Sequence, residues 1–428
     1  MAQEAAPRSA KPPTRSGAQP RERAAANGAG SAVGRFPPAL VLGDVDMVSA
    51  LAVGGIPSAV FDDPDSDARF SRHVRRMLPY RDPVEAPDEA ARTLLDWART
   101  QPEPPVAFPQ TDDALLLISR RRAELGDHLR FALAEPELVE QLVDKGRFQA
   151  LAERHGLPIP RARRFDPRAG AGPQDLDLRF PLVLKPIQRR THWDSIAHGH
   201  KALQARDARE LAEQWPCLVD AGSEIMAQEL IAGPESRIES FHAYIDERGE
   251  IAGWFTGRKL RTFPAQHGHS TAVQITAEPD VAALGREILE ELGFRGVVKV
   301  DFKRDADGAL HLLEINGRFN LWHLPGALAG VNLPALVHAD LTGRPRPATG
   351  PARPGVAWCR PLRDVRAAYV AGMSPPAWLR WARTCDAVSG LSREDPLPFL
   401  RGTLPATVAN QSSRALGAGL RRLRRRSG

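Results

Sequence analysis

The sequence predicts an α/β protein in which a doubly wound first domain precedes a larger α+β region. Residues 36–135 alternate between short apolar strands and amphipathic helices, which is the pattern of a parallel sheet covered by helices. Residues 294–320 differ, because two strands of alternating polarity flank the turn residues Asp305-Ala306-Asp307-Gly308 and so predict an antiparallel hairpin. Together the two patterns indicate a mixed fold with at least two domains in 428 residues.

The first domain contains three predicted strand–helix pairs. Each strand is short and apolar, and each helix carries its apolar residues on one face. The strands are expected at 38–45, 57–63 and 105–113, and the helices at 47–55, 88–100 and 114–125. The turn after the first strand, GDVDMVSALAVGG, lacks the G-x-G-x-x-G spacing, so dinucleotide binding is not supported.

The second region begins with a helical stretch at 135–156. Asp207 and Asp280 are the predicted N-caps of helices at 207–215 and 281–293, because a short acidic side chain accepts bonds from the first free N–H groups. Strands are expected at 180–186, 200–206 and 224–230, with hairpins between 236 and 320. The last ninety residues are rich in Pro and Arg and show only weak helical patterns.

Arginine replaces lysine almost throughout the chain. Of the 58 basic residues, 51 are arginines and seven are lysines, so each retained lysine is a residue of interest. The formal net charge is +6, but residues 1–35 carry +4 and residues 341–428 carry +12, which leaves residues 36–340 with about −10. An acidic body argues against coating a phosphate backbone, and we expect no specific nucleic-acid partner.

The cysteines and the apolar content indicate a cytoplasmic protein. Cys217, Cys359 and Cys385 lie far apart and suggest neither a disulfide framework nor a thiolate zinc site. No window approaches the roughly 18 apolar residues of a membrane span. Residues 1–35 are expected to be a disordered tail. Residues 414–428 combine leucines at helical spacing with six arginines, which predicts at most weak peripheral contact with an anionic membrane.

The predicted hairpin carries the most informative polar residues. Side chains alternate along a strand, so Lys299 and Asp301 project from one face, while Leu312, Glu314 and Asn316 share a face of the second strand. The turn register places Glu314 near Lys299 and diagonally across from Asp301. Two carboxylates and an amide oxygen then converge, and such hard ligands suit Mg²⁺, or Mn²⁺, that takes phosphate oxygens as further ligands. A solvated hairpin in which Glu314 pairs with Lys299 is the alternative.

Other segments carry residues suited to a nucleotide. Lys185 ends the apolar strand FPLVLKP, where a lysine needs an anion such as a phosphate, unless it reaches solvent. Lys145 lies on the preceding helix, where a solvated helix face is the simpler interpretation. The backbone of residues 229–231 can face an adenine rim, and Glu235 can hold two ribose hydroxyls. The sequence GRKLR at 257–261 adds a basic cluster that a solvated strand edge would also explain.

The order of these pieces resembles the ATP-grasp superfamily. The nucleotide- and metal-binding residues of that superfamily occur in a fixed order and spacing, which this chain matches. The matching residues are Lys145, Lys185, the linker Gln228-Glu229-Leu230-Ile231 with Gly233-Pro234-Glu235, and Asp301…Glu314-x-Asn316. The E-x-N ending followed by Gly317-Arg318-Phe319 resembles the carboxylate-amine ligase branch, which includes D-alanine:D-alanine ligases and D-aspartate ligase-like proteins.

The resemblance covers about residues 36–345 and implies an ATP-grasp fold. In that fold a Rossmann-like pre-ATP-grasp domain precedes two α+β subdomains that clamp ATP. The implied boundaries are 36–135 for the first domain, 136–345 for the ATP-grasp domain with subdomains at about 145–230 and 231–345, and 346–428 for a C-terminal extension.

The resemblance also implies a role for each matching residue. Lys145 and Lys185 would contact the α and β phosphates, the linker Gln228-Glu229-Leu230-Ile231 would meet the adenine, and Glu235 would hold the ribose. Asp301, Glu314 and Asn316 would hold the metal ions. Arg318 would face the transferred phosphate or the substrate carboxylate. Lys259, or its neighbour Arg258, would approach the γ phosphate and the acyl phosphate.

The implied reaction is a ligation that consumes ATP. A substrate carboxylate becomes an acyl phosphate, an amine attacks it to form an amide, and ADP and phosphate leave. Both substrates are expected to be amino-acid-like, although a thiol or bicarbonate acceptor would use the same site, and a homodimer is expected. The segment 186–200, PIQRRTHWDSIAHGH, lacks the glycines and serines of the phosphate flap in many relatives. A nucleotide-binding module without turnover, or one that a partner activates, is therefore the alternative function.

Overall fold

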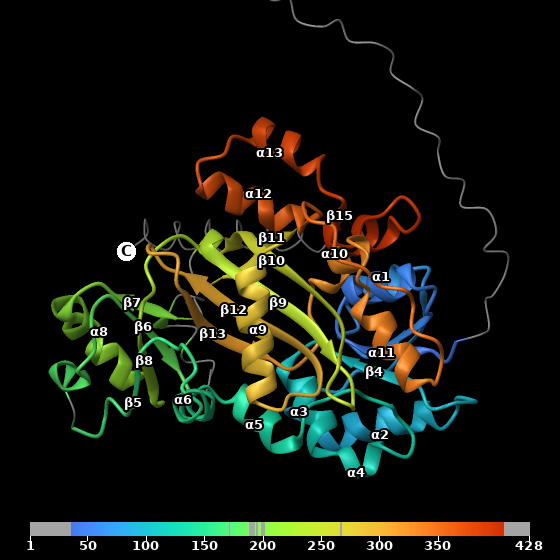
Figure 1. The fold of residues 1–428 in the computed structure, drawn as a ribbon, viewed down its shortest axis with the longest axis horizontal. Coiled ribbons are helices and arrows are strands. Elements are labelled where there is room, and N and C mark those ends of the chain that lie inside the picture. Colours follow the sequence, from blue (N-terminus) through green and yellow to red (C-terminus); the bar gives the residue numbers. More distant parts are fainter. Residues whose placement is uncertain are drawn as a thin grey trace, which may run out of the picture. The chain divides into compact units, whose positions relative to one another are not determined.

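The computed structural model describes residues 36–170, 172–187, 193, 196–197, 202–265 and 268–405. The chain divides into Met1–Phe36 and Pro37–Gly428, and the described strands of the second unit form three sheets (Figure 1). The predicted tails at 1–35 and 414–428, and most of the predicted flap at 186–200, lie outside the described residues.

The first sheet is parallel, with the strand order β3-β2-β1-β4. Its elements are β1 (Ala39–Leu42), α1 (Val45–Val53), β2 (Ser58–Val60), β3 (Val74–Met77), α2 (Pro87–Ala98), β4 (Val106–Pro109), α3 (Asp112–Arg120) and α4 (Arg122–Leu125). The three predicted strand–helix pairs are confirmed. The sequence pattern does not predict β3, because this edge strand reads VRRM and exposes both arginines.

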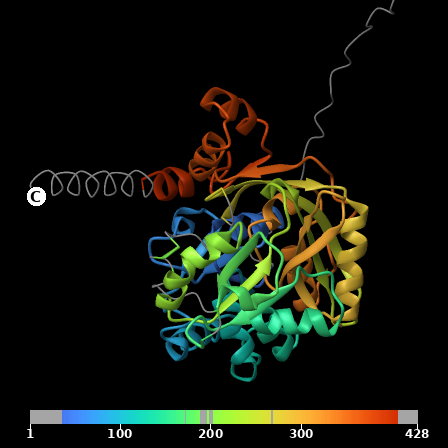
Figure 2. The ribbon, with the colours of Figure 1, turned by 90° about the vertical axis from the view of Figure 1, so that its left-hand side faces the viewer.

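The second sheet is antiparallel, with the order β5-β8-β6-β7, and it faces the viewer in Figure 2. It consists of β5 (Ala162–Phe165), β6 (Leu182–Pro186), β7 (Leu203–Ala205) and β8 (Ile225–Glu229), and α5 (Pro136–Val143), α6 (Lys145–Arg154) and α8 (Ala208–Asp220) accompany it. The predicted helix at 135–156 is two helices, because Asp144 leaves helical geometry and caps α6 by accepting the Arg147 N–H. Asp207 caps α8 as predicted.

The third and largest sheet has the order β13-β12-β9-β10-β11-β14-β15. Its strands are β9 (Ile238–Ile245), β10 (Ile251–Phe263), β11 (His269–Thr276), β12 (Gly296–Arg304), β13 (Leu310–Asn316), β14 (Ala357–Cys359) and β15 (Ala387–Val388). The helix α9 (Pro279–Glu291) packs on one face, where a Cβ on Gly285 would come within 2.5 Å of the Phe241 ring. Asp280 is not the N-cap of α9, because the helix begins at Pro279, two residues earlier than predicted, and Glu278 is its N-cap.

Apolar packing joins the first sheet to the largest one and leaves the second sheet with a core of its own. Val41 and Val48 share a cluster with Val273 and Phe255, together with residues of α10 (His323–Leu328) and α11 (Leu333–Leu341). The second sheet forms a separate cluster with α8. Among the described residues the second sheet therefore shares no apolar cluster with the largest sheet, while the charge of Glu314 on the largest sheet acts on Lys185 of the second.

The C-terminal extension adds β14, β15 and two helices, α12 (Pro361–Val370) and α13 (Pro375–Ala382). Asp364 is fully buried and anchors α12 to β10 by accepting two hydrogen bonds from Arg261, at 2.8 and 2.7 Å. Thr271 and Trp378 each donate a further bond of 2.8 Å to Asp364, and the Trp381 ring lies 3.9 Å from the Arg261 guanidinium carbon. No helix among the described residues is long and apolar enough to cross a bilayer.

We expect Asp364→Ala to destabilise the protein strongly. Removing one partner of a buried ion pair leaves the other charge uncompensated, which costs about 3–5 kcal/mol. Urea denaturation should show the midpoint falling accordingly. Glu394→Ala is the matched control, because Glu394 is an exposed acid of the same extension. Equal midpoints for the two variants would mean that the Arg261–Asp364 pair does not hold the extension in place.

Candidate active site

Two carboxylates face each other across β12 and β13. The strand register pairs Asp301 directly with Glu314, and Lys299 with Asn316. The predicted register, in which Glu314 lies near Lys299 and diagonal to Asp301, is therefore wrong by two residues. All four side chains nevertheless project from one face of the hairpin, because residues paired across two strands share a face.

A turn one residue longer than predicted, which pairs Arg304 with Leu310, and a β-bulge together explain the difference in register. Phe302 pairs with Leu312 while Asp301 pairs with Glu314, so Leu313 has no partner on β12. The bulge also turns Leu312 into the core, where it is 0% exposed. The prediction that Leu312 shares a face with Glu314 is wrong for the same reason, because an extra residue reverses the alternation of the strand.

Asp301 is the centre of the site. Its side chain is 1% exposed, and its Oδ2 atom lies 2.5 Å from Lys299 Nζ and 3.6 Å from Lys259 Nζ. Ser240 on β9 donates its hydroxyl to Oδ1. Burial alone would raise the pKa of Asp301, but the charges of Lys299 and Lys259 hold it well below its usual range. Asp301 is therefore ionised at neutral pH and balances two ammonium groups.

The two lysines that share Asp301 respond differently to their surroundings. Burial lowers the pKa of Lys299 despite the attraction of Asp301. Burial also opposes the charge of Lys259, but Asp301, Glu314 and Glu235 together raise its pKa above the ordinary value. Lys259 therefore stays charged at neutral pH, and it faces the same carboxylates as Lys299.

Lys185 and Lys145 approach this site from the second sheet. Lys185 Nζ donates to the Gln228 side-chain oxygen at 3.0 Å, and Lys145 Nζ donates to the Pro186 carbonyl at 3.1 Å. Burial lowers the pKa of Lys185, while the charge of Glu314 on the largest sheet works against this shift. The structure thus brings Lys185 within reach of the Glu314 charge, with Lys145 near Lys185, and Lys185 lies at the end of its strand as predicted.

Glu235 joins the two halves of the site. It begins the short 3₁₀ turn η3 (Glu235–Arg237) between β8 and β9. Its negative charge acts on Lys185 of the second sheet and on Lys259 and Lys303 of the largest sheet. Glu235 therefore lies at the junction of the two sheets, among the lysines.

The linker from Gln228 to Ile231 contributes less to this cluster. The Glu229 carboxylate accepts from Arg179, with Nη2 at 2.9 Å, and Arg161 lies 3.6 Å away. Arg179 lowers the pKa of Glu229 although burial opposes the shift. The Leu230 N–H donates to the Pro181 carbonyl. The Glu229 side chain and the Leu230 N–H are thus occupied within the second sheet, and the predicted contact with adenine is left to the Leu230 carbonyl and the Ile231 backbone.

Arg318 connects the Asn316 end of the hairpin to the first sheet. Its Nη2 lies 3.4 Å from Asn316 Oδ1, and its Nε lies 2.5 Å from Asp112 Oδ1. Its Nη1 donates to the Gln110 carbonyl at 3.0 Å. Gln110 directly follows β4, so the carboxyl edge of the parallel sheet orients Arg318, and ligands of α/β sheets bind at such edges.

Arg258 and Lys259 project from opposite faces of the largest sheet, and Arg258 lies on the face away from Asp301. Arg258 pairs in register with Glu239, whereas Lys259 projects toward Asp301. Burial raises the pKa of Glu239 to about 7, assisted by Glu278 and opposed by Arg258. Of the two neighbours proposed from the sequence for the γ phosphate, the geometry brings only Lys259 to the site.

Sequence reasoning missed some residues that contact the site. Ser240 and Asp112 hold Asp301 and Arg318, and no local pattern marks either one. Lys303 lies two residues after Asp301 on the same face of β12, and the alternation used to pair Lys299 with Asp301 also predicts it.

The donor set at the hairpin suits a hard cation. Asp301, Glu314 and Asn316 offer carboxylate and amide oxygens on one face, which Mg²⁺ prefers when phosphate oxygens complete its shell. Within the described ranges, no group of three or more His, Cys, Asp or Glu side chains could hold a metal ion by itself. The geometry therefore fits a metal that substrate oxygens help to bind rather than a closed structural site.

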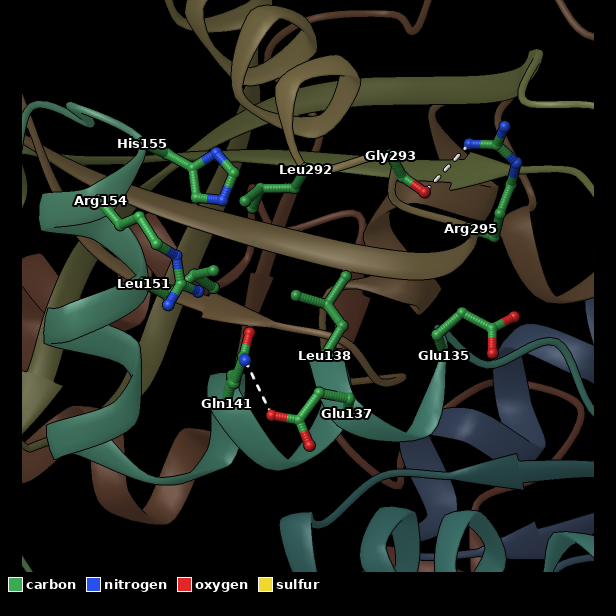
Figure 3. A pocket seen from close by; sticks show the side chains of 10 residues that line it. All are labelled: Glu135, Glu137, Leu138, Gln141, Leu151, Arg154, His155, Leu292, Gly293 and Arg295. Carbon is green, nitrogen blue, oxygen red and sulfur yellow. Dashed lines mark hydrogen bonds between the residues drawn. The ribbon is translucent and has the colours of Figure 1, made fainter.

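A separate pocket of about 290 Å³ lies among α5, α6 and the end of α9 (Figure 3). Its lining residues are Glu135, Glu137, Leu138, Gln141, Leu151, Arg154, His155, Leu292, Gly293 and Arg295. None of the predicted site residues is among them, and Glu137 and Arg295 are occupied by Gln141 and backbone carbonyls. We therefore place the chemistry at the lysine–carboxylate cluster.

Comparison with known proteins finds relatives among ATP-grasp ligases. Residues 224–360 match the family model described as "ATP-grasp in the biosynthetic pathway with Ter operon". The D-aspartate ligase of Enterococcus faecium (strain Aus0004) is 27% identical over 233 residues, which is 52% of this chain and 55% of that protein. The D-alanine–D-alanine ligase of Stutzerimonas stutzeri (strain A1501) is 27% identical over 188 residues, with 41% and 54% covered. The chain thus spans about half the length of these relatives.

A solved structure shows the same fold at lower sequence identity. The ADP complex of an N5-carboxyaminoimidazole ribonucleotide synthetase aligns with a TM-score of 0.56 and 16% identity, covering 75% of this chain and 81% of that one. At this identity the likeness concerns the fold alone.

We expect Glu239→Gln to remove a pH-dependent loss of stability. An acid with a pKa near 4.3 when unfolded and about 7 when folded binds a proton preferentially in the folded state, so the protein loses stability as pH rises between these values. Relative to the variant, the wild type should lose on the order of 3 kcal/mol of unfolding free energy between pH 4 and pH 8. Urea titrations at stepped pH measure this difference.

Glu247→Gln provides the control for this measurement, because Glu247 follows the same strand and is exposed. Its stability profile should run parallel to that of the wild type. A parallel profile for Glu239→Gln as well would contradict the burial of an uncompensated acid at this position.

Proposed function

We propose that the chain is an ATP-grasp protein of the carboxylate-amine ligase branch and that it joins a carboxylate to an amine at the expense of ATP. The observation that carries the proposal is the convergence of Lys259, Lys299 and Asp301 with Glu314 and Asn316 on one face of the largest sheet. This arrangement combines cations for a polyphosphate with oxygen ligands for Mg²⁺ or Mn²⁺. The substrates are amino-acid-like, as the names of the relatives suggest.

ATP is proposed to lie between the second and the largest sheet. Lys145 and Lys185 approach from the second sheet and would hold its phosphates. The backbone after β8 would border the adenine, and Glu235 at the junction would bind the ribose hydroxyls. With these contacts the nucleotide would run from its base beside β8, past its ribose at Glu235, to its γ phosphate beside Lys259. Lys259 lies 3.6 Å from Asp301, and the charge of Glu235 also acts on it.

Asp301, Glu314 and Asn316 are the residues that would hold the metal. A bound Mg²⁺ supplies charge neutralisation between the phosphate oxygens. Asp301 already balances two ammonium groups, so a cation at this carboxylate would release Lys259 and Lys299 toward other anions. The two lysines would then be available to the transferred phosphoryl group and the substrate carboxylate.

The proposed reaction has two steps. An oxygen of the substrate carboxylate attacks the γ phosphorus, and the bond to the oxygen bridging the β and γ phosphorus atoms breaks, which releases ADP. The amine nitrogen then attacks the acyl carbon, the bond from that carbon to the phosphate oxygen breaks, and phosphate leaves as the amine loses a proton. Neither step needs a nucleophile from the protein, so the side chains contribute positioning and charge stabilisation.

Arg318 is proposed to orient the carboxylate that is phosphorylated. It lies beside Asn316 and is fixed by Asp112 and the Gln110 carbonyl, so its guanidinium position depends on the first sheet. A planar guanidinium suits a planar carboxylate, because both can form two parallel hydrogen bonds. The first domain would thus influence the choice of substrate through Arg318.

We expect Glu314→Gln to reduce ADP formation by at least about 100-fold, because the variant loses one charge at the proposed metal site. ADP release is measured with Mg-ATP across a panel of amino-acid pairs, and it should require both a carboxylate and an amine. Asp307→Asn is the control, because it removes an exposed carboxylate from the turn of the same hairpin. ATP binding without turnover for any pair would instead favour a non-catalytic or partner-activated module.

A further inference from the structure

Lysine is restricted to one place in the described structure. The five lysines among the described residues are Lys145, Lys185, Lys259, Lys299 and Lys303, and all of them lie at the junction of the second and largest sheets. Every other cationic side chain of the described residues, histidines aside, is an arginine. Lys145, Lys185, Lys259 and Lys299 each contact a carbonyl or carboxylate oxygen or have a proposed role, whereas Lys303 has neither.

Lys303 is buried in the floor of this site. It lies on β12 between Ile238 of β9 and His311 of β13, and it is 5% exposed. It follows Asp301 by two residues and therefore projects from the same face. No described residue forms a hydrogen bond or an ion pair with its ammonium group. The side chain is thus largely covered, while its ammonium group faces the site with no neutralising partner among the described residues and is available to an anion.

The charges at the junction indicate what kind of anion the site can take. Five ammonium groups lie near three carboxylates, those of Asp301, Glu314 and Glu235, which leaves a surplus of two positive charges. Glu235 is the acid that acts most on Lys303, but its charge is shared with Lys185 and Lys259. A polyphosphate would neutralise the surplus, whereas a single carboxylate would not.

The position of Lys303 selects one phosphate of the chain. Under the proposed function Glu235 binds the ribose, and the α phosphate is attached directly to the 5′ oxygen of that sugar. The β and γ phosphates extend away from the ribose toward Asp301 and Lys259. Because Lys303 lies beside Glu235 on the strand that carries Asp301, we propose that Lys303 binds the α phosphate of the nucleotide from the largest sheet. This inference rests on the proposed function.

A compact ammonium group suits this position better than a guanidinium. Lys303 is flanked by Ile238 and His311 on the two neighbouring strands and is almost entirely enclosed. A point charge with three donors fits beneath a phosphate in a narrow space, whereas a planar guanidinium requires room for its fork. The same reasoning explains why lysine is retained here in a chain that uses arginine elsewhere.

Metal-free binding of adenosine, AMP and ADP tests the proposal. In the presence of EDTA, Lys303→Met should weaken AMP and ADP binding by about tenfold or more, because a charge-assisted hydrogen bond is lost, and leave adenosine binding within about twofold. Equal weakening of adenosine and AMP would overturn the proposal, since Lys303 would then act on the ribose through Glu235. Unchanged AMP binding would overturn it as well.

Two controls separate this inference from the proposed function. Arg237→Met removes an exposed cation from the turn that carries Glu235 and should leave the ratio of AMP to adenosine affinity unchanged. If the wild type binds none of the three ligands, the proposed function fails. If the wild type binds them and Lys303→Met does not weaken AMP binding selectively, the proposed function stands and only the contact between Lys303 and the α phosphate is wrong. Lys303→Gln is measured in the same way, so that a folding defect of one variant does not decide the outcome.

Discussion

The site depends on one buried carboxylate that balances two ammonium groups. Asp301 lies almost entirely out of water, and a charge there is tolerated only because Lys299 and Lys259 approach the same oxygen atom. Neither lysine would be stable at its position without Asp301, for the same reason. The three residues come from β10 and β12, with Ser240 of β9 adding a hydrogen bond, so three adjacent strands must pair in one register to satisfy these charges.

The distribution of apolar cores explains how the surrounding sheets serve this site. The first and largest sheets share a core, so the carboxyl edge of the first sheet keeps a fixed position beside Arg318. The second sheet has a core of its own and contributes Lys145 and Lys185 through polar contacts. A ligand that neutralises the lysines would strengthen this polar junction, which is how two subdomains can close on a nucleotide. The C-terminal extension reinforces β10, the strand of Lys259, through the buried Arg261–Asp364 pair.

Lysine and arginine have distinct places in this protein. Arginine forms the ion pairs that hold elements together, as in the two parallel bonds between Arg261 and Asp364. Lysine occurs where an ammonium group lies near a small carboxylate or points to a site for a polyphosphate. The composition of the chain favours arginine, so under the proposed function retention of lysine at these positions would reflect the geometry of the bound anion rather than the need for positive charge alone.

The sequence by itself determined the alternating elements of the first sheet, the hairpin at the end of the largest sheet and the set of charged residues that suit a nucleotide. Apolar periodicity, turn residues and the placement of Lys185 at a strand end are local properties, and local patterns predict them well. Local patterns do not place Asp280 correctly, since Pro279 starts α9 earlier, and they miss the bulge at Leu313.

Tertiary structure alone decided which of the charged residues meet. Arg258 and Lys259 are neighbours in sequence, yet the pairing of β9 with β10 places them on opposite faces, and only Lys259 reaches Asp301. Glu229 turns to Arg179, and Arg318 depends on Asp112, which lies 206 residues away in the chain. A one-residue change in strand register reverses every side chain, so the composition of the site follows from long-range pairing that no local segment encodes.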